Sequence, residues 1–172
     1  MFYSVKESIH KATDAKTEGH PLKIYTDGSS RGNPGPGGYG AVLLWGEAQK
    51  ELSGGYRLTT NNRMELLAVI KALESLKKRN ISVTIYTDSQ YVVNSVEKKW
   101  LDNWIRTDFK GGKKNKDLWL HFHALSKHFK LRFIWVKGHA NNQWNNRCDE
   151  LATAAADGKH LLVDEAYESE NA

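Results

Sequence analysis

Hydrophobic and polar positions follow two periods along this chain. Short apolar, β-rich runs predict five strands, at residues 22–26, 39–45, 50–58, 81–87 and 129–136. Apolar residues three and four positions apart predict four helices, at residues 61–76, 89–99, 117–128 and 146–156. The glycine-rich residues 32–38 predict a loop between the first two strands. Asn62, with Glu65 three residues later, predicts a capping box at the start of the first helix.

The predicted order β-β-β-α-β-α-α-β-α indicates an α/β domain with a mixed sheet, whose first three strands form an antiparallel meander. A length of 172 residues suits one domain, and a 40% apolar fraction can supply its core. We expect a domain over residues 22–158, an N-terminal extension over 1–21 with no assignable role, and an acidic tail over 159–172.

Composition restricts the class of protein further. The only cysteine, Cys148, excludes an intrachain disulfide framework and a multi-cysteine zinc site, so we expect it to be a small packed residue. No apolar run approaches the roughly 18 residues of a membrane span. The first residues lack the basic start and apolar block of a secretory signal. These observations predict a cytoplasmic protein with no membrane partner.

Charge is distributed unevenly along the chain, although the formal total is only +5. Residues 96–116 hold seven basic against three acidic side chains, a net of +4, with aromatic residues between them. A basic block of this kind is typical of contact with a nucleic-acid backbone, and a solvated lysine face is the alternative. The tail from residue 157 holds five acids against one lysine, a net of -4, and we interpret it as a solvating end.

Two aspartates occur in the same local context. Asp27 and Asp88 each follow a strand ending in Tyr-Thr and precede small or polar residues. Either residue alone is also typical of a turn or a helix cap. The repeated context favours a different role, because two apolar strands would deliver two carboxylates to the edge of the sheet where α/β proteins bind ligands.

Two further acids lie near predicted helix starts. Glu65 borders the apolar face of its helix, and its alternative role is the capping box. Asp149 also lies near a helix start, where its alternative role is a favourable interaction with the helix dipole. Four clustered carboxylates would repel one another unless divalent cations neutralised them. Oxygen ligands favour Mg²⁺ or Mn²⁺, and two such ions would suit in-line phosphoryl displacement.

A set of motifs in fixed order makes the chain similar to a known family. The matching segments are Tyr-Thr-Asp-Gly-Ser at 25–29, Gly-Asn-Pro-Gly-Pro-Gly-Gly-Tyr-Gly at 32–40, Thr-Asn-Asn-Arg-Met-Glu at 60–65, Thr-Asp-Ser-Gln-Tyr-Val at 87–92, Asp-Leu-Trp at 117–119, Trp-Val-Lys-Gly-His-Ala at 135–140 and Arg-Cys-Asp-Glu-Leu-Ala at 147–152. Together they closely resemble type 1 ribonuclease H of the bacterial form.

The resemblance implies a ribonuclease H-like α/β fold, a five-stranded mixed sheet with helices on both faces. It implies hydrolysis of the RNA strand of RNA–DNA hybrids, leaving 5′-phosphate and 3′-hydroxyl ends. By motif position, Asp27, Glu65, Asp88 and Asp149 correspond to the family's metal-binding carboxylates. His139 corresponds to the family's loop histidine, which assists proton transfer or product release.

The resemblance also implies contacts with the two strands of the hybrid. Gly28, Ser29, Asn33 and Gln90 fall where the family contacts the RNA strand, and Thr60, Asn61 and Asn115 where it holds the DNA strand, including a DNA phosphate. Residues 96–116 match the family's basic protrusion. Its expected substrate contacts are Trp100, Lys113, Lys114 and Lys116, although Trp100 and Trp104, four residues apart, also suit helix packing.

The chain departs from the family pattern at a few positions. Ile105, Thr107 and Asp108 stand where relatives often carry more basic or neutral residues, and Leu58 replaces a base. A weaker grip on the substrate is the expected consequence. The alternatives are a different nuclease or strand transferase on the same fold, and a hybrid-binding module without activity. We expect no protein partner and a monomer, because no uncovered apolar heptad indicates a coiled coil.

Overall fold

The structure is a computed structural model that describes residues 21–138 and 141–171. Its centre is one five-stranded sheet with the strand order β3-β2-β1-β4-β5. The strands are β1 (Leu22–Ser30), β2 (Gly35–Trp45), β3 (Ala48–Thr59), β4 (Ile81–Thr87) and β5 (Phe129–Trp135). Strands β1 to β3 form the predicted antiparallel meander, and β4 and β5 add in parallel to β1. The sheet is therefore mixed, as the sequence predicts.

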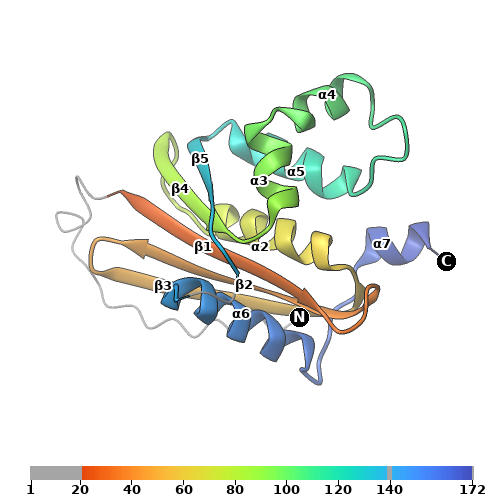
Figure 1. The fold of residues 1–172 in the computed structure, drawn as a ribbon, viewed down its shortest axis with the longest axis horizontal. Helices are drawn as coiled ribbons and strands as arrows, with labels where there is room; N and C mark the ends of the chain where they lie inside the picture. The colour runs from red at the N-terminus through yellow and green to blue at the C-terminus, as the bar shows by residue number, and fades with distance from the viewer. Residues whose placement is uncertain (1–20, 139–140, 172) are drawn as a thin grey trace.

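Helices cover both faces of the sheet (Figure 1). They are α2 (Asn61–Glu74), α3 (Gln90–Glu97), α4 (Trp100–Arg106), α5 (Lys116–Ser126), α6 (Gln143–Ala156) and α7 (Glu165–Glu170). Helix α6 packs across β1, β2 and β3 on one face, while α2, α3 and α5 lie on the other. Among the described residues, no helix is both long enough and apolar enough to cross a membrane.

The core lies between α2 and the sheet. Leu66, Ile70 and Leu73 of α2 are fully buried, as are Ile24 of β1 and Ile85 of β4. Burial of each such side chain stabilises the fold by about 1.5–3 kcal/mol. This packing fixes the start of α2 against the end of β1, and the predicted site residues Asp27 and Glu65 lie at that junction.

The parallel register of β1 and β4 brings two loops together. Thr26 pairs with Thr87, so Asp27 and Asp88 follow at the same edge of the sheet. The repeated Tyr-Thr-Asp context thus has a structural counterpart, because adjacent parallel strands end side by side.

Three local features differ from the predicted elements. Residues 35–38 were expected in a loop but begin β2, where the absence of a side chain at Gly38 lets α6 approach the sheet. Helix α4 was not predicted; it is separated from α3 by Lys99, whose left-handed φ of 59° ends the first helix. Helix α7 was also not predicted.

The acidic C-terminal segment is not the solvating end that its charge suggests. Leu162 donates its backbone N–H to Gly55 O, and Arg57 donates in turn to Leu162 O, which attaches the segment to β3. The Asp164 carboxylate is buried beside the Arg63 guanidinium, at 2.7 Å. The backbone contacts hold this segment on the sheet, and the ion pair compensates the charge of Asp164.

Candidate active site

Asp27 and Asp88 lie at the carboxyl ends of β1 and β4. Asp27 is a buried residue within β1, and its Oδ1 accepts a hydrogen bond of 2.9 Å from Gly28 N. Asp88 follows β4 and does not cap α3, because Ser89 does so by accepting from Val92 N at 3.2 Å. Neither carboxylate therefore caps a helix, although helix capping is one of the alternative roles that the sequence suggests.

Glu65 is buried in the second turn of α2. The predicted capping box is wrong, because Thr60 is the cap and its hydroxyl accepts from Arg63 N at 3.3 Å. The helix begins at Asn61, one residue before the expected cap Asn62. Glu65 therefore lies beyond the cap amides, and its carboxylate faces the hollow that Asp27 and Asp88 also line.

Asp149 reaches the same hollow from α6. This helix begins at Gln143, earlier than predicted, with Asn142 as its cap. Asp149 consequently lies about two turns into the helix, beyond the first turn where the dipole acts. The four predicted acids thus come from β1, α2, α6 and the loop after β4, and together they line one hollow of about 660 Å³.

Three of these acids are close enough to share a cation. One carboxylate oxygen each from Asp27, Glu65 and Asp88 lies within 4.8 Å of the other two. Glu65 Oε2 is buried without a hydrogen-bond partner among the described residues. A buried carboxylate oxygen without a partner is costly, and a cation would satisfy it. The all-oxygen donor set fits Mg²⁺ or Mn²⁺.

The electrostatics agree with a site built for positive charge. Burial and the nearby Asp88 charge raise the pKa of Asp27 to about 8. Burial, followed by the charge of Asp27, raises the pKa of Glu65 well above its usual value. Cys148, beneath them, is fully buried and donates its thiol to Tyr25 O at 3.2 Å. Burial raises the pKa of the Cys148 thiol, so it is a packed residue, as expected from the sequence.

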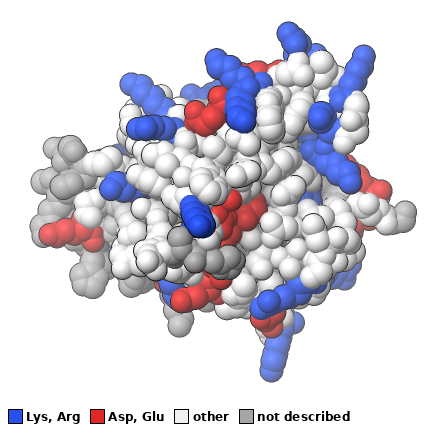
Figure 2. All heavy atoms as spheres, in the orientation of Figure 1, with Lys and Arg blue, Asp and Glu red and all other residues white. Residues whose placement is uncertain are grey.

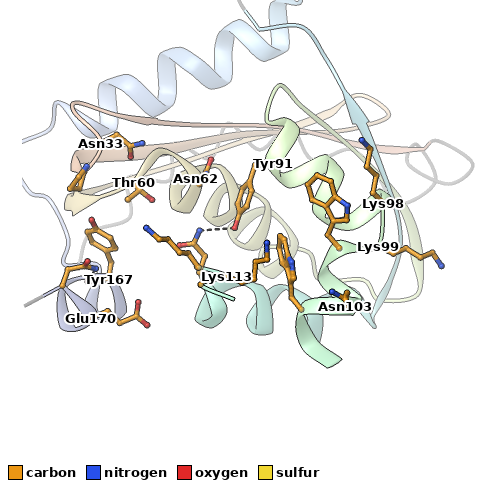
Figure 3. Close-up of a pocket in the computed structure, with 17 residues that line it drawn as sticks. Asn33, Thr60, Asn62, Tyr91, Lys98, Lys99, Asn103, Lys113, Tyr167 and Glu170 are labelled. Carbon is orange, nitrogen blue, oxygen red and sulfur yellow. Dashed lines mark hydrogen bonds between the residues drawn. The ribbon is translucent and has the colours of Figure 1, made fainter. Parts of the chain in front are cut away.

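A larger groove continues from the hollow, with Asn62 and Tyr91 lining both. Its volume is about 1130 Å³. Figure 3 shows its two sides: Asn33, Thr60 and Tyr167 lie on one, and Lys98, Lys99 and Asn103 on the other. The residues predicted to contact substrate divide between the two spaces. Gly28, Ser29, Asn61 and Gln90 line the hollow, while Asn33, Thr60, Trp100, Lys113, Lys114 and Asn115 line the groove.

The basic segment supplies one wall of this groove. Lysine and arginine side chains project over α4 and the turn between α4 and α5 (Figure 2). Lys113 Nζ lies 5.7 Å from the ring centre of Trp104, and Trp104 itself is buried against Tyr91. Trp100, by contrast, is 42% exposed in the groove. The packing role thus holds for Trp104, whereas Trp100 is available to a ligand.

Two predicted residues are not placed in either space. Lys116 forms an ion pair with Asp108 at 2.7 Å and does not line the groove. His139 lies outside the described residues. Its neighbour Gly138 adjoins the carboxylates, since a Cβ there would stand 2.7 Å from Asp88 Oδ2.

The structure adds groove residues that the sequence reasoning missed. Tyr91 follows the Asp-Ser-Gln motif, and its hydroxyl accepts from Asn115 Nδ2 at 3.1 Å and Trp119 Nε1 at 2.7 Å. The motif was the signal that could have identified it. Tyr167 and Glu170 of α7 also line the groove. An aromatic residue within an acidic tail was the only sequence signal for Tyr167.

Comparisons with known proteins agree with this arrangement. A family model described as RNase H matches residues 19–157. The chain is 52% identical to a ribonuclease H of Syntrophus aciditrophicus over 160 residues, covering 91% of this chain and 92% of that protein. It is 51% identical to a ribonuclease H of Idiomarina loihiensis over 152 residues, covering 87% and 96% respectively.

Solved structures give the same result. LC9-RNase H1, described as a type 1 RNase H with the type 2 active-site motif, has a TM-score of 0.73 at 28% identity, covering 89% of this chain and 81% of that one. LC11-RNase H1 in complex with an RNA/DNA hybrid has a TM-score of 0.60 at 28% identity, covering 79% and 96%.

Proposed function

The chain belongs to the ribonuclease H family, and we propose that it hydrolyses the RNA strand of RNA–DNA hybrids with the help of divalent metal ions. The observation that carries this proposal is the meeting of Asp27, Glu65 and Asp88 within 4.8 Å, in a hollow that opens into a groove lined by lysines. A related protein has been seen in complex with an RNA/DNA hybrid.

The metal is proposed to be Mg²⁺, with Mn²⁺ as a substitute, in one or two ions. Asp27, Glu65 and Asp88 would hold it, with Asp149 as a fourth carboxylate on the same hollow. Such ions, when bound, lower the pKa of water and stabilise charge on the leaving oxygen. The carboxylates would hold such ions from fixed positions on β1, α2, α6 and the loop after β4.

The reaction is a hydrolysis in which water adds to phosphorus of the RNA strand and the bond to the 3′-oxygen breaks. The products are a 5′-phosphate and a 3′-hydroxyl. We propose that His139, which follows Gly138 next to Asp88, assists by giving a proton to the leaving oxygen or by helping product depart.

Strand choice would rest on the 2′-hydroxyl, the group by which RNA differs from DNA. Gly28, Ser29 and Gln90 share the hollow with the carboxylates, which suits contact with the strand that is cut. Asn33 Oδ1 accepts from Asn61 N at 3.1 Å, which holds the β1–β2 turn against the start of α2. Thr60 and Asn115 line the groove farther on, which suits the DNA strand.

We further propose that the protein acts as a monomer in the cytoplasm. One chain supplies all four carboxylates and both walls of the groove, so no second copy is needed to complete the site. The ribonuclease H relatives that it matches come from bacteria, which supports the cytoplasm as its location.

A cleavage assay on four labelled substrates tests the proposal. The substrates are an RNA–DNA hybrid, double-stranded RNA, double-stranded DNA and a DNA duplex with one ribonucleotide, each with Mg²⁺, Mn²⁺ or EDTA. Cutting of the hybrid alone, abolished by EDTA, is the expected result. Preferential cutting of DNA would favour another nuclease on this fold, and metal-independent binding without cleavage would favour a binding module. Efficient cutting at one ribonucleotide within a DNA duplex would contradict the expectation that the hybrid alone is cut.

A further inference from the structure

Helix α7 forms part of the groove wall. Tyr167, Glu170 and Asn171 line the groove with Thr60 and Asn115, although they lie in the acidic tail. In Figure 3, Tyr167 and Glu170 stand on the same side as Asn33 and Thr60, opposite Lys98 and Lys99. A segment of net negative charge thus borders a space that is otherwise basic.

The contacts of α7 with the domain hold it in place before any ligand arrives. Asp164 accepts from Arg63 Nε at 2.7 Å, from Arg63 Nη2 at 2.9 Å and from Thr59 Oγ1 at 2.7 Å. Glu168 accepts from Arg57 Nη2 at 2.9 Å. Asp164 and Glu168 are therefore already paired, and the residues that remain for the groove are Tyr167 and Glu170.

Tyr167 presents a hydrogen-bond donor to the groove. Its ring lies 5.9 Å from the Arg63 guanidinium carbon, and its hydroxyl has no hydrogen-bond partner among the described residues. The Thr60 hydroxyl accepts from Arg63 N, so its own proton is free to point outward. Two hydroxyl donors on one wall, facing lysines on the other, match a ligand that offers only acceptors, such as a phosphodiester.

Glu170 has the opposite effect on such a ligand. It is exposed on the same wall, and its carboxylate repels a phosphate within a Debye length. The backbone of a bound strand is thus attracted at Tyr167 and disfavoured one helical turn farther along α7.

We propose that α7 forms the outer wall of the DNA-strand site, with Tyr167 as a further positioning residue that donates its hydroxyl to a DNA phosphate and Glu170 as the acidic boundary beyond it. The inference rests on the proposed function. The DNA strand is assigned here because this wall adjoins Thr60 and Asn115, whereas the carboxylates that would serve the cut strand lie in the adjoining hollow.

Three single variants separate this role from a merely structural one. Tyr167→Phe removes only the hydroxyl and should raise KM about 3- to 10-fold with kcat within twofold, the loss of one hydrogen bond of ordinary net strength. Glu170→Gln should lower KM about twofold at low salt, an effect that salt removes. Glu165→Gln is the matched control, because it removes the same charge from an exposed position of α7 that does not line the groove, and its KM should match wild type.

Opposite shifts in KM at unchanged Tm support the proposal. It is overturned if Tyr167→Phe and Glu170→Gln both leave KM unchanged, or if both variants change KM only in proportion to a change in Tm. A wild-type protein that cuts no hybrid would instead contradict the proposed function, so the two failures are distinguishable.

A neutral methylphosphonate placed at each DNA position of the hybrid in turn identifies the contact. At one position the substitution should lower the affinity of the wild-type protein for the hybrid, measured in EDTA. The same substitution should lower the affinity of Tyr167→Phe by a factor about 3-fold smaller, because this variant lacks the hydroxyl that would donate to the phosphate. If every position costs both proteins equally, Tyr167 contacts no DNA phosphate and the assignment is wrong.

Discussion

Gly28 lies directly against the backbone of Glu65: a Cβ built at position 28 would stand 2.2 Å from Glu65 N. This approach brings the end of β1 onto the start of α2 and allows the Asp27 and Glu65 carboxylates to share one hollow. The small residue after Asp27 is therefore required by the close approach of the two segments that carry the Asp27 and Glu65 carboxylates.

Gly28→Ala should displace these two segments and reduce kcat about 100-fold or more, because misplacement by roughly 1 Å is that costly in a positioned site. Tm should fall as well, through overpacking of about 1–3 kcal/mol. Gly158→Ala is the matched control, since its Cβ would meet its nearest atom, Ala155 O, at 3.1 Å and far from the hollow. A Gly28→Ala enzyme with normal kcat would show that the close approach is dispensable.

Asp88→Asn should abolish most activity while preserving the fold. The amide keeps the shape but removes the charge that the cluster offers to a cation, so we expect cleavage to fall by about three orders of magnitude or more. Steady-state kinetics across a Mg²⁺ titration check this, with circular dichroism to confirm folding. Asp102→Asn, an exposed acid on α4, is the control and should behave as wild type. Near-normal cleavage by Asp88→Asn would remove this residue from the catalytic set.

Stability without metal should fall as pH rises through the window set by Asp27. Its pKa is 3.8 in ordinary surroundings and about 8 in the folded protein. Between these values the unfolded chain has lost the proton that the folded chain keeps, so the folded state is progressively disfavoured from about pH 4 to about pH 8. Asp27→Asn removes the pH-dependent loss of stability, because the amide carries no charge. The Tm of this variant near pH 8 should therefore exceed that of wild type, by about 2–4 °C for each kcal/mol of stability regained.

Calorimetry in EDTA over that pH range measures this effect. Addition of Mg²⁺ near pH 8 should raise the Tm of wild type and should raise that of Asp27→Asn much less. If the Tm of the two proteins in EDTA changed with pH in parallel, burial and the charge of Asp88 would not destabilise the ionised Asp27 carboxylate.

The sequence allowed prediction of the site more fully than of its surroundings. Asp27 and Asp88 could be placed together because parallel strands that are adjacent in a sheet end at one edge, and the motif order identified Glu65 and Asp149. The helix caps were predicted less well: Thr60, Asn61 and Asn62 are all good cap residues, and only side-chain geometry selects Thr60. Helix α7 depends on a pairing of Arg63 with Asp164, 101 positions apart, which no local pattern contains.

Asp164→Ala should be among the most destabilising single changes outside the apolar core. The Arg63 side chain is 3% exposed, and two carboxylates, Asp164 and Asp117, compensate its charge. Burial alone would lower the Arg63 pKa, but the two ion pairs raise it above its usual value. Removal of one partner of a buried pair costs about 3–5 kcal/mol. Asp157→Ala is the control, since its pair with Arg31 is exposed on both sides and screened by solvent, so its loss should change stability much less.

Denaturant unfolding of both variants compares these energies directly. The opposing outcome is that Asp164→Ala lowers the free energy of unfolding by no more than Asp157→Ala does. In that case Asp117 alone would compensate the Arg63 charge, and the C-terminal segment would be held mainly by its backbone contacts with β3.

Neutralisation of Lys113 and Lys114 should weaken substrate binding without changing the chemistry. Both lysines line the groove, outside the hollow of the carboxylates. Each phosphate contact releases counterions, so the double variant Lys113→Gln/Lys114→Gln should lower the slope of log affinity against log salt by about two units. KM should rise most at low salt, and kcat should stay within a few-fold, because binding used equally in ground and transition states affects KM. Lys116 is left unchanged in this variant because its ammonium is already paired with Asp108.

Lys130→Gln is the control for this prediction. It removes the same charge from an exposed position on β5, away from both the groove and the hollow, and should leave the salt slope unchanged. If the double variant also kept the wild-type slope, the basic segment would be a solvated lysine face. If instead kcat collapsed at constant KM, the segment would have to shape the carboxylate site, a role that the separation of the two lysines from Asp27 and Asp88 argues against. The salt slope distinguishes these cases more sharply than KM at one salt concentration, because only lost phosphate contacts change the number of ions released.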